Sequence, residues 1–142
     1  MAEAQYIAGM GFSNVGLGIV HSMAHPLGAF YDTPHGVANA TLLPYVMEYN
    51  AESPSRAKYL DIARAMGVKT DGMSVDEGVR AAVDAVKALS LSIRIPQRLH
   101  ELGVREEDIP ALAVAAFNDV CTGGNPRPTS VEEIERLYHI AY

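Results

Sequence analysis

The sequence predicts an all-α protein, a single helical-bundle domain of about seven helices that spans residues 1–142. Three observations lead to this fold class. Apolar residues recur at three- and four-residue spacing along most of the chain, which is typical of helices that bury one face. Signals for helix starts recur between these segments. No stretch alternates apolar and polar residues as a half-buried strand does, so no sheet is expected.

Two helices are expected before residue 31. The apolar spacing predicts the first over 2–10 and the second over about 14–30, with Ser13 or Asn14 as the N-cap of the second. The second helix is apolar on most sides, so we expect it to be buried.

Five more helices follow from their start signals. Thr33 and Ser53 each precede a proline, and Ser74 forms a capping box with Glu77. The last helix is expected after Ser130, with every third or fourth residue buried. The expected spans are 34–50, 54–67, 75–90, 108–119 and about 130–141.

Composition excludes several classes of protein. Hydrophobic residues make up 49% of the chain and charged residues 20%, which indicates a folded globular domain. The formal net charge is -6, and no basic stripe suggests binding to nucleic acid or to an anionic membrane. No apolar run is long enough to span a membrane. One cysteine cannot form an internal disulfide, which favours a reducing compartment, and we expect a cytoplasmic protein.

Three of the five histidines lie within fifteen residues, at positions 21, 25 and 35. His21 and His25 are four residues apart and share one face of a helix, and His35 can fold back toward them after a short turn. Clustered imidazoles suggest a metal site or a proton-transfer site. The metallopeptidase signature requires glutamate directly after the first histidine, where this chain has Ser22. The residues alone leave open whether the histidines bind metal or are structural.

The segment around the histidines resembles a known signature. Residues 11–40, GFSNVGLGIVHSMAHPLGAFYDTPHGVANA, resemble the metal-binding signature of the iron-dependent (group III) alcohol dehydrogenases. Further similar segments bring the resemblance to essentially the whole chain, and they favour the branch that interconverts lactaldehyde and 1,2-propanediol; they are 43–44, 62–68, 108–113 and 119–127. Enzymes of that family are much longer, with an α/β nucleotide-binding domain before an all-helical domain. The resemblance implies that this chain is the C-terminal helical domain alone.

The resemblance also implies roles for individual residues. His21 and His35 would be the two ligands that this domain gives to Fe2+, or to Zn2+ as in some relatives, while an Asp and a His from an upstream segment complete the set. His25 would lie beside the metal and the nicotinamide and take part in proton transfer. Phe12 and Cys121 resemble positions that line the substrate pocket.

The implied activity is that of an NAD-dependent oxidoreductase acting on a small alcohol or aldehyde, with a homodimeric full-length enzyme. Without the nucleotide-binding domain, the isolated chain is expected to be inactive and to expose an apolar face over about 12–36. Two other hypotheses remain at this stage. One is a self-contained helical binding or interaction module with structural histidines. The other is a small metallo-hydrolase that uses all three histidines, with Asp32 or Glu48 as its base.

Overall fold

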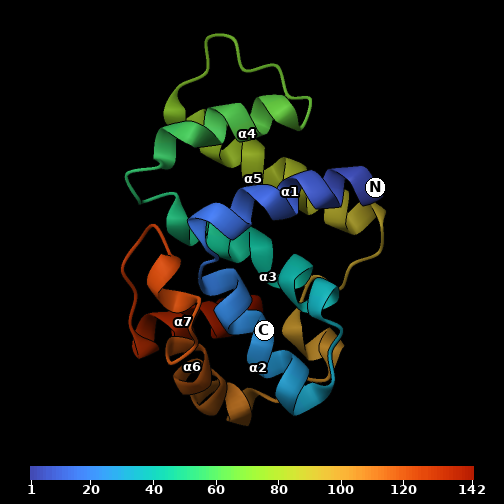
Figure 1. Ribbon diagram of the computed structural model, residues 1–142, viewed down its shortest axis with the longest axis vertical. Helices are drawn as coiled ribbons and strands as arrows, with labels where there is room; N and C mark the ends of the chain where they lie inside the picture. Colours follow the sequence, from blue (N-terminus) through green and yellow to red (C-terminus); the bar gives the residue numbers. More distant parts are fainter.

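The computed structural model describes all 142 residues and contains helices but no strand (Figure 1). This confirms the all-α fold class and the expected number of helices. Four short 3-10 helices join or extend the main ones. The seven α-helices are α1 (Ala2–Val15), α2 (Ile19–Tyr31), α3 (His35–Asn50), α4 (Tyr59–Ala65), α5 (Val75–Ser92), α6 (Ile109–Phe117) and α7 (Val131–Ala141). None of them is both long enough and apolar enough to cross a lipid bilayer.

The main hydrophobic core lies among α2, α3, α6 and α7. Tyr138 of α7 is fully buried there, and its hydroxyl donates a 2.6 Å hydrogen bond to the carbonyl oxygen of Met23 in α2. The other large side chains that are completely buried in this core are Met23 and seven aliphatic ones: Ile19, Leu27, Leu42, Leu99, Ile109, Leu112 and Ile134. The helix that carries two of the histidines is therefore held on its inner face by the core, as its apolar composition predicted.

A second, smaller core lies between α4 and α5, at the opposite end of the molecule from α6 and α7 (Figure 1). It contains Tyr59 and Ala63 of α4 together with Ala82 and Val83 of α5. The long helix α3 reaches both cores, because its first half packs in the main core and Met47, near its end, packs against the smaller one. Helix α3 thereby connects the two ends of the fold.

The first helix is longer than expected and lies on the surface. Helix α1 continues to Val15, so the expected break over 11–14 is wrong, and Ser13 and Asn14 lie inside α1 and do not cap α2. The break falls at Gly16, whose φ of 84° is accessible to glycine, and α2 begins at Ile19. None of the residues of α1 is buried.

The expected start signals agree with the structure in part. Ser74 forms the predicted capping box with Glu77, and Ser130 accepts a hydrogen bond from the amide of Glu133. Ser53 does not begin a helix, because its hydroxyl accepts from the amide of Ser55 and α4 starts only at Tyr59. The third helix starts one residue later than expected, so that His35 is its first residue.

Candidate metal centre

The three histidines of the cluster come together on one side of α2 and at the start of α3. The ring centroids of His21 and His25 are 6.3 Å apart, and each of these rings lies 5.4 Å from the ring of His35. Asp32 allows this by ending α2 in the left-handed conformation, with a φ of 53°, so that the chain reverses before α3. The expectation that His35 folds back toward the other two is confirmed.

His21 has the properties of a histidine that can bind a metal ion. Its Nδ1 is buried and has no hydrogen-bond partner, which is unusual for a buried polar atom. Burial, followed by the neighbouring His35 and His25, lowers the pKa of His21 below its usual value. A lowered pKa keeps the imidazole neutral, which is the form that binds metals.

The histidine cluster can supply part of the ligand set of a metal centre. His35 is exposed and His21 is only half-buried, so the rings are open to solvent on one side. A catalytic metal site commonly has three protein ligands and an open position for water or substrate. Two imidazoles from this chain leave room for ligands from elsewhere, so the residues present fit the group that the sequence implies.

His25 differs from the other two histidines because its partner is a carboxylate, whereas the ring of His35 contacts the side-chain amide of Asn39 and Nδ1 of His21 has no partner. The Nδ1 of His25 lies 2.8 Å from Oδ2 of Asp119, a residue that follows α6. The sequence alone did not identify Asp119 as a site residue. Its signals were its position at the end of a predicted helix and its place at the start of the similar segment 119–127, and neither shows which side chain the carboxylate meets.

The Asp119 carboxylate is fixed from several sides. Its Oδ1 accepts a 2.8 Å hydrogen bond from the amide of Cys121 and lies 3.5 Å from the hydroxyl of Ser22. Burial alone raises the pKa of Asp119, but the hydrogen bonds from the Cys121 amide and from His25 outweigh it and hold the pKa below its usual value. Asp119 is therefore an ionised acceptor held in one place.

His25, Asp119 and Cys121 also converge closely enough to suggest a metal site of their own, since one ligand atom from each lies within 4.8 Å of the others. The geometry argues against it. Two ligands of one tetrahedral ion stand about 3.3 Å apart, whereas His25 and Asp119 are at hydrogen-bond distance. Burial and the adjacent Asp119 raise the pKa of the Cys121 thiol, which keeps it protonated and makes it a poor ligand.

The two expected pocket residues lie in different surroundings. Cys121 is half-buried next to Asp119 and so lies beside the histidine cluster. Phe12 is 44% exposed on the surface helix α1, and its ring stacks on none of the three imidazoles.

Neither carboxylate of the hydrolase hypothesis is placed well to act as its base. Glu48 is thirteen residues along α3 from His35, which corresponds to about 20 Å of helix, and it forms a 2.6 Å ion pair with Lys87. Asp32 is an exposed residue of the turn after α2.

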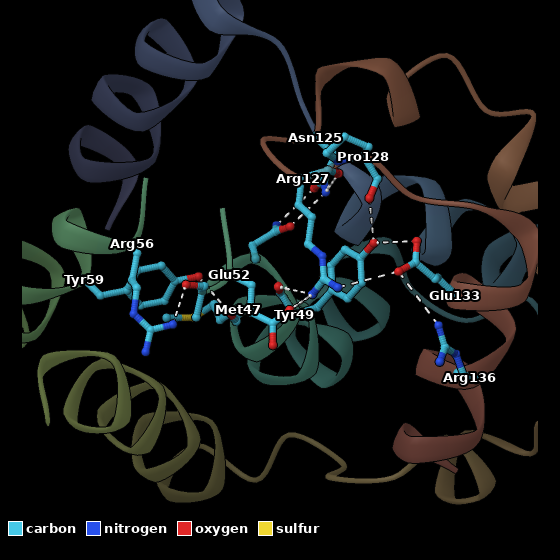
Figure 2. Close-up of polar contacts among 12 residues, drawn as sticks. Met47, Tyr49, Glu52, Arg56, Tyr59, Asn125, Arg127, Pro128, Glu133 and Arg136 are labelled. Carbon is cyan, nitrogen blue, oxygen red and sulfur yellow. Dashed lines mark hydrogen bonds and ion pairs between the residues drawn. The ribbon is translucent and has the colours of Figure 1, made fainter. Parts of the chain in front are cut away.

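The loop between α6 and α7, which carries Asp119 and Cys121, is anchored at its far end by Arg127 (Figure 2). The Arg127 guanidinium lies 3.9 Å from the centroid of the Tyr49 ring and donates to the Tyr49 carbonyl oxygen. It also pairs with Glu52 at 2.9 Å and with Glu133 at 3.6 Å. These contacts tie the loop to the end of α3 and to the start of α7.

Comparison with known proteins decides the family. The model of the C-terminal region of the Fe-containing alcohol dehydrogenase family matches residues 1–142. The chain belongs to this family. Its all-helical fold is thus that of a C-terminal domain of an iron-containing alcohol dehydrogenase.

Relatives in this iron-containing family cover the whole chain. Lactaldehyde reductase of Escherichia coli (strain K12) is 66% identical over all 142 residues, and 1,3-propanediol dehydrogenase of Citrobacter freundii is 46% identical over the same length. A solved alcohol dehydrogenase from Oenococcus oeni superposes on 99% of the chain with a TM-score of 0.94 and 41% identity. The chain spans 36–37% of the length of these relatives.

Proposed function

We propose that this chain is the metal-ligating C-terminal domain of an NAD-dependent, iron-dependent oxidoreductase that interconverts lactaldehyde and 1,2-propanediol, or a similar small alcohol and aldehyde pair. The observation that carries the proposal is the convergence of His21, His25 and His35, together with the buried, unpaired nitrogen of His21. The 66% identity to a lactaldehyde reductase supports the choice of substrate.

The three histidines have two different roles in this proposal. His21 and His35 hold the ion, Fe2+ or alternatively Zn2+, together with an Asp and a His from a segment upstream of residue 1. When bound, the ion supplies a Lewis acid for the substrate oxygen and NAD supplies the hydride acceptor or donor. His25 serves instead as the group beside the nicotinamide that passes a proton, with its Nδ1 held by Asp119 and its Nε2 free for the transfer.

The substrate pocket forms between this domain and the upstream one, with Phe12 and Cys121 on its wall. A half-buried thiol and an aromatic ring suit a small, partly apolar substrate of three carbons. The full-length enzyme is proposed to be a cytoplasmic homodimer. On its own, the 142-residue chain is proposed to be inactive, because it has only two of the ligands and no site for NAD.

A chimera tests the proposal. The chain replaces the matching C-terminal region of the Escherichia coli lactaldehyde reductase, and the NAD-linked oxidation of 1,2-propanediol is measured. We expect activity from the chimera, none from the isolated chain, and loss of activity in the chimera when His21 and His35 are both changed to Ala. A folded chimera without activity would contradict the proposed function, and activity of the isolated chain would contradict the divided site. A chimera that tolerates both substitutions would indicate structural histidines.

A further inference from the structure

The contact between His25 and Asp119 joins two distant parts of the chain. His25 lies on α2, and Asp119 follows α6, 94 residues later. Their side chains meet at 2.8 Å, and 39% of the His25 side chain and 17% of the Asp119 side chain are exposed. The pair is thus only partly shielded from water, and its geometry depends on what holds the carboxylate in place.

The carboxylate is held independently of His25. The amide of Cys121 donates to its Oδ1, and the hydroxyl of Ser22, one turn before His25 on α2, lies on the same side. Thr122 extends this contact, since its Oγ1 is 2.8 Å from both the Ser22 hydroxyl and the carbonyl oxygen of Ala116. The loop after α6 therefore presents Oδ2 of Asp119 to His25 in a fixed position.

A fixed carboxylate determines which nitrogen of His25 carries the proton. An ionised carboxylate only accepts hydrogen bonds, so Nδ1 must be the protonated nitrogen in the neutral ring. The other nitrogen, Nε2, then has a free lone pair, and it makes no hydrogen bond within the chain. The ring itself is stacked on His35 with an interplanar angle of 19°, which limits its rotation.

We infer that Asp119 is a positioning residue that holds His25 in the Nδ1–H tautomer, so that Nε2 is the proton acceptor in the reaction. This inference rests on the proposed function, in which His25 transfers the proton. During alcohol oxidation Nε2 would take the hydroxyl proton of the substrate, and NAD, when bound, would supply the hydride acceptor. The resulting imidazolium is stabilised by the charge of Asp119, and its Nδ1–H remains bonded to Oδ2.

The first test is a spectroscopic measurement on the 142-residue chain. The chain is labelled with 15N at its histidines, and two-bond proton–nitrogen correlation spectra are recorded. The pH is about 8.5, which lies above the usual histidine pKa of about 6.5. We expect His25 to show a protonated Nδ1 and an unprotonated Nε2. In Asp119→Ala the pattern should shift toward the opposite tautomer, Nε2–H. Asp119→Asn serves as the second variant if the alanine variant fails to fold.

The matched control is Asp108→Ala. Asp108 is a hydrogen-bonded carboxylate at the other end of α6, where it pairs with Tyr31 and Arg105. Its removal disturbs α6 without touching the histidines, so the tautomer of His25 should be unchanged. An unchanged tautomer in both Asp119 variants would overturn the inference, as would the same shift in Asp108→Ala.

The second test uses the chimera and separates the two proposals. Asp119→Ala should lower kcat about 10- to 100-fold with little change in KM, as is usual for residues that orient a catalytic group. Unchanged kcat would overturn the role of Asp119 in the reaction. An inactive parent chimera would overturn the proposed function, while the tautomer spectra would still decide whether Asp119 positions His25.

Discussion

The side-chain oxygen of Asn125 accepts a hydrogen bond from the backbone amide of Ile19, the first residue of α2, at 3.3 Å and across 106 residues of sequence. The N-cap position itself is Gly18, which has no side chain to cap the helix. A Cβ at Gly18 would lie 2.9 Å from the same oxygen of Asn125, so glycine leaves room for this contact. The start of the helix that carries His21 and His25 thus depends on a hydrogen bond from a distant loop.

Removing this contact is expected to destabilise the domain. In Asn125→Ala the amide of Ile19 loses its acceptor, and the reciprocal amide pair with Asn50, at 3.0 and 2.8 Å, is also lost. Losing a helix cap costs about 1 kcal/mol, and losing the partly buried hydrogen bonds to Asn50 costs about as much again. We therefore expect the free energy of unfolding to fall by about 2 kcal/mol. Urea unfolding followed by circular dichroism measures the difference.

Two further variants separate the cap from the amide pair. Asn125→Asp keeps an oxygen that can accept from Ile19 but loses the donor to Asn50, and Asn50→Ala loses the pair while leaving the cap. Both should be destabilised less than Asn125→Ala. An alanine variant at residue 125 as stable as the parent would show that the cap contributes nothing.

The Asn125 contact also shows which features the sequence could predict. The start of α5 depends on Ser74 and Glu77, which are three residues apart, and the capping box predicted it correctly. The start of α2 depends on Asn125, and local signals at Ser13 and Asn14 gave the wrong boundary. Local hydrogen bonds can be inferred from spacing, whereas a cap from another loop requires knowledge of the tertiary fold.

The same difference between local contacts, which the sequence predicts, and long-range contacts, which it does not, holds at the candidate site. His21 and His25 are one helical turn apart, so their proximity follows from sequence spacing, and a short turn brings His35 to them. Asp119 meets His25 only because α6 packs against α2, which no spacing reveals. The sequence therefore predicted the clustering of the histidines but not the carboxylate that distinguishes His25 from the other two.

This distinction leads to a prediction about metal binding by the isolated chain. We expect weak binding of Fe2+ or Zn2+ that is lost, by about 10-fold or more, in His21→Ala and His35→Ala. His25→Ala should bind within a few-fold of the parent, because the proposed function assigns His25 to proton transfer and not to metal ligation. Anaerobic titration calorimetry of the four proteins makes the comparison. Tight, stoichiometric binding that needs all three histidines would instead indicate a complete small metal site.

The surface helix α1 is expected to make the isolated chain self-associate. The exposed apolar face was expected over about 12–36, where Phe12, Val15 and Phe30 are indeed exposed but α2 buries much of the rest. Exposed apolar side chains also occur earlier on α1. Those of α1 include Tyr6, Ile7, Met10 and Val15, with exposures from 48% to 79%. A cluster of this kind on a protein surface favours association.

A charged substitution on this helix tests the expectation. Ile7→Glu should shift the chain toward monomer in sedimentation velocity, with little change in the free energy of unfolding because no residue of α1 is buried. Val114→Glu is the matched control, since Val114 is 49% exposed on α6, which lies apart from α1 (Figure 1). A parent chain that is monomeric at all concentrations, or an equal effect of both variants, would contradict a role for α1.

The buried hydroxyl of Tyr138 gives a prediction about stability and its pH dependence. It donates to the carbonyl oxygen of Met23 within the helix that carries the histidines, and Tyr138→Phe removes this bond. We expect a loss of about 1 kcal/mol in the free energy of unfolding at neutral pH. Burial, with a smaller effect of Asp119, raises the pKa of Tyr138 far above the usual 10.0 in the folded protein.

The raised pKa fixes the sign of the alkaline effect. Above about pH 10 the unfolded chain loses the Tyr138 proton while the folded chain keeps it, so the unfolded state binds fewer protons and stability falls as the pH rises. The contribution of Tyr138 is thus fully present below about pH 10 and is lost above it. The stability of Tyr138→Phe should therefore decline less steeply above pH 10 than that of the parent, and the two curves should converge. Parallel curves from urea unfolding between about pH 8 and 11 would show that Tyr138 ionises as readily in the folded protein as in the unfolded chain.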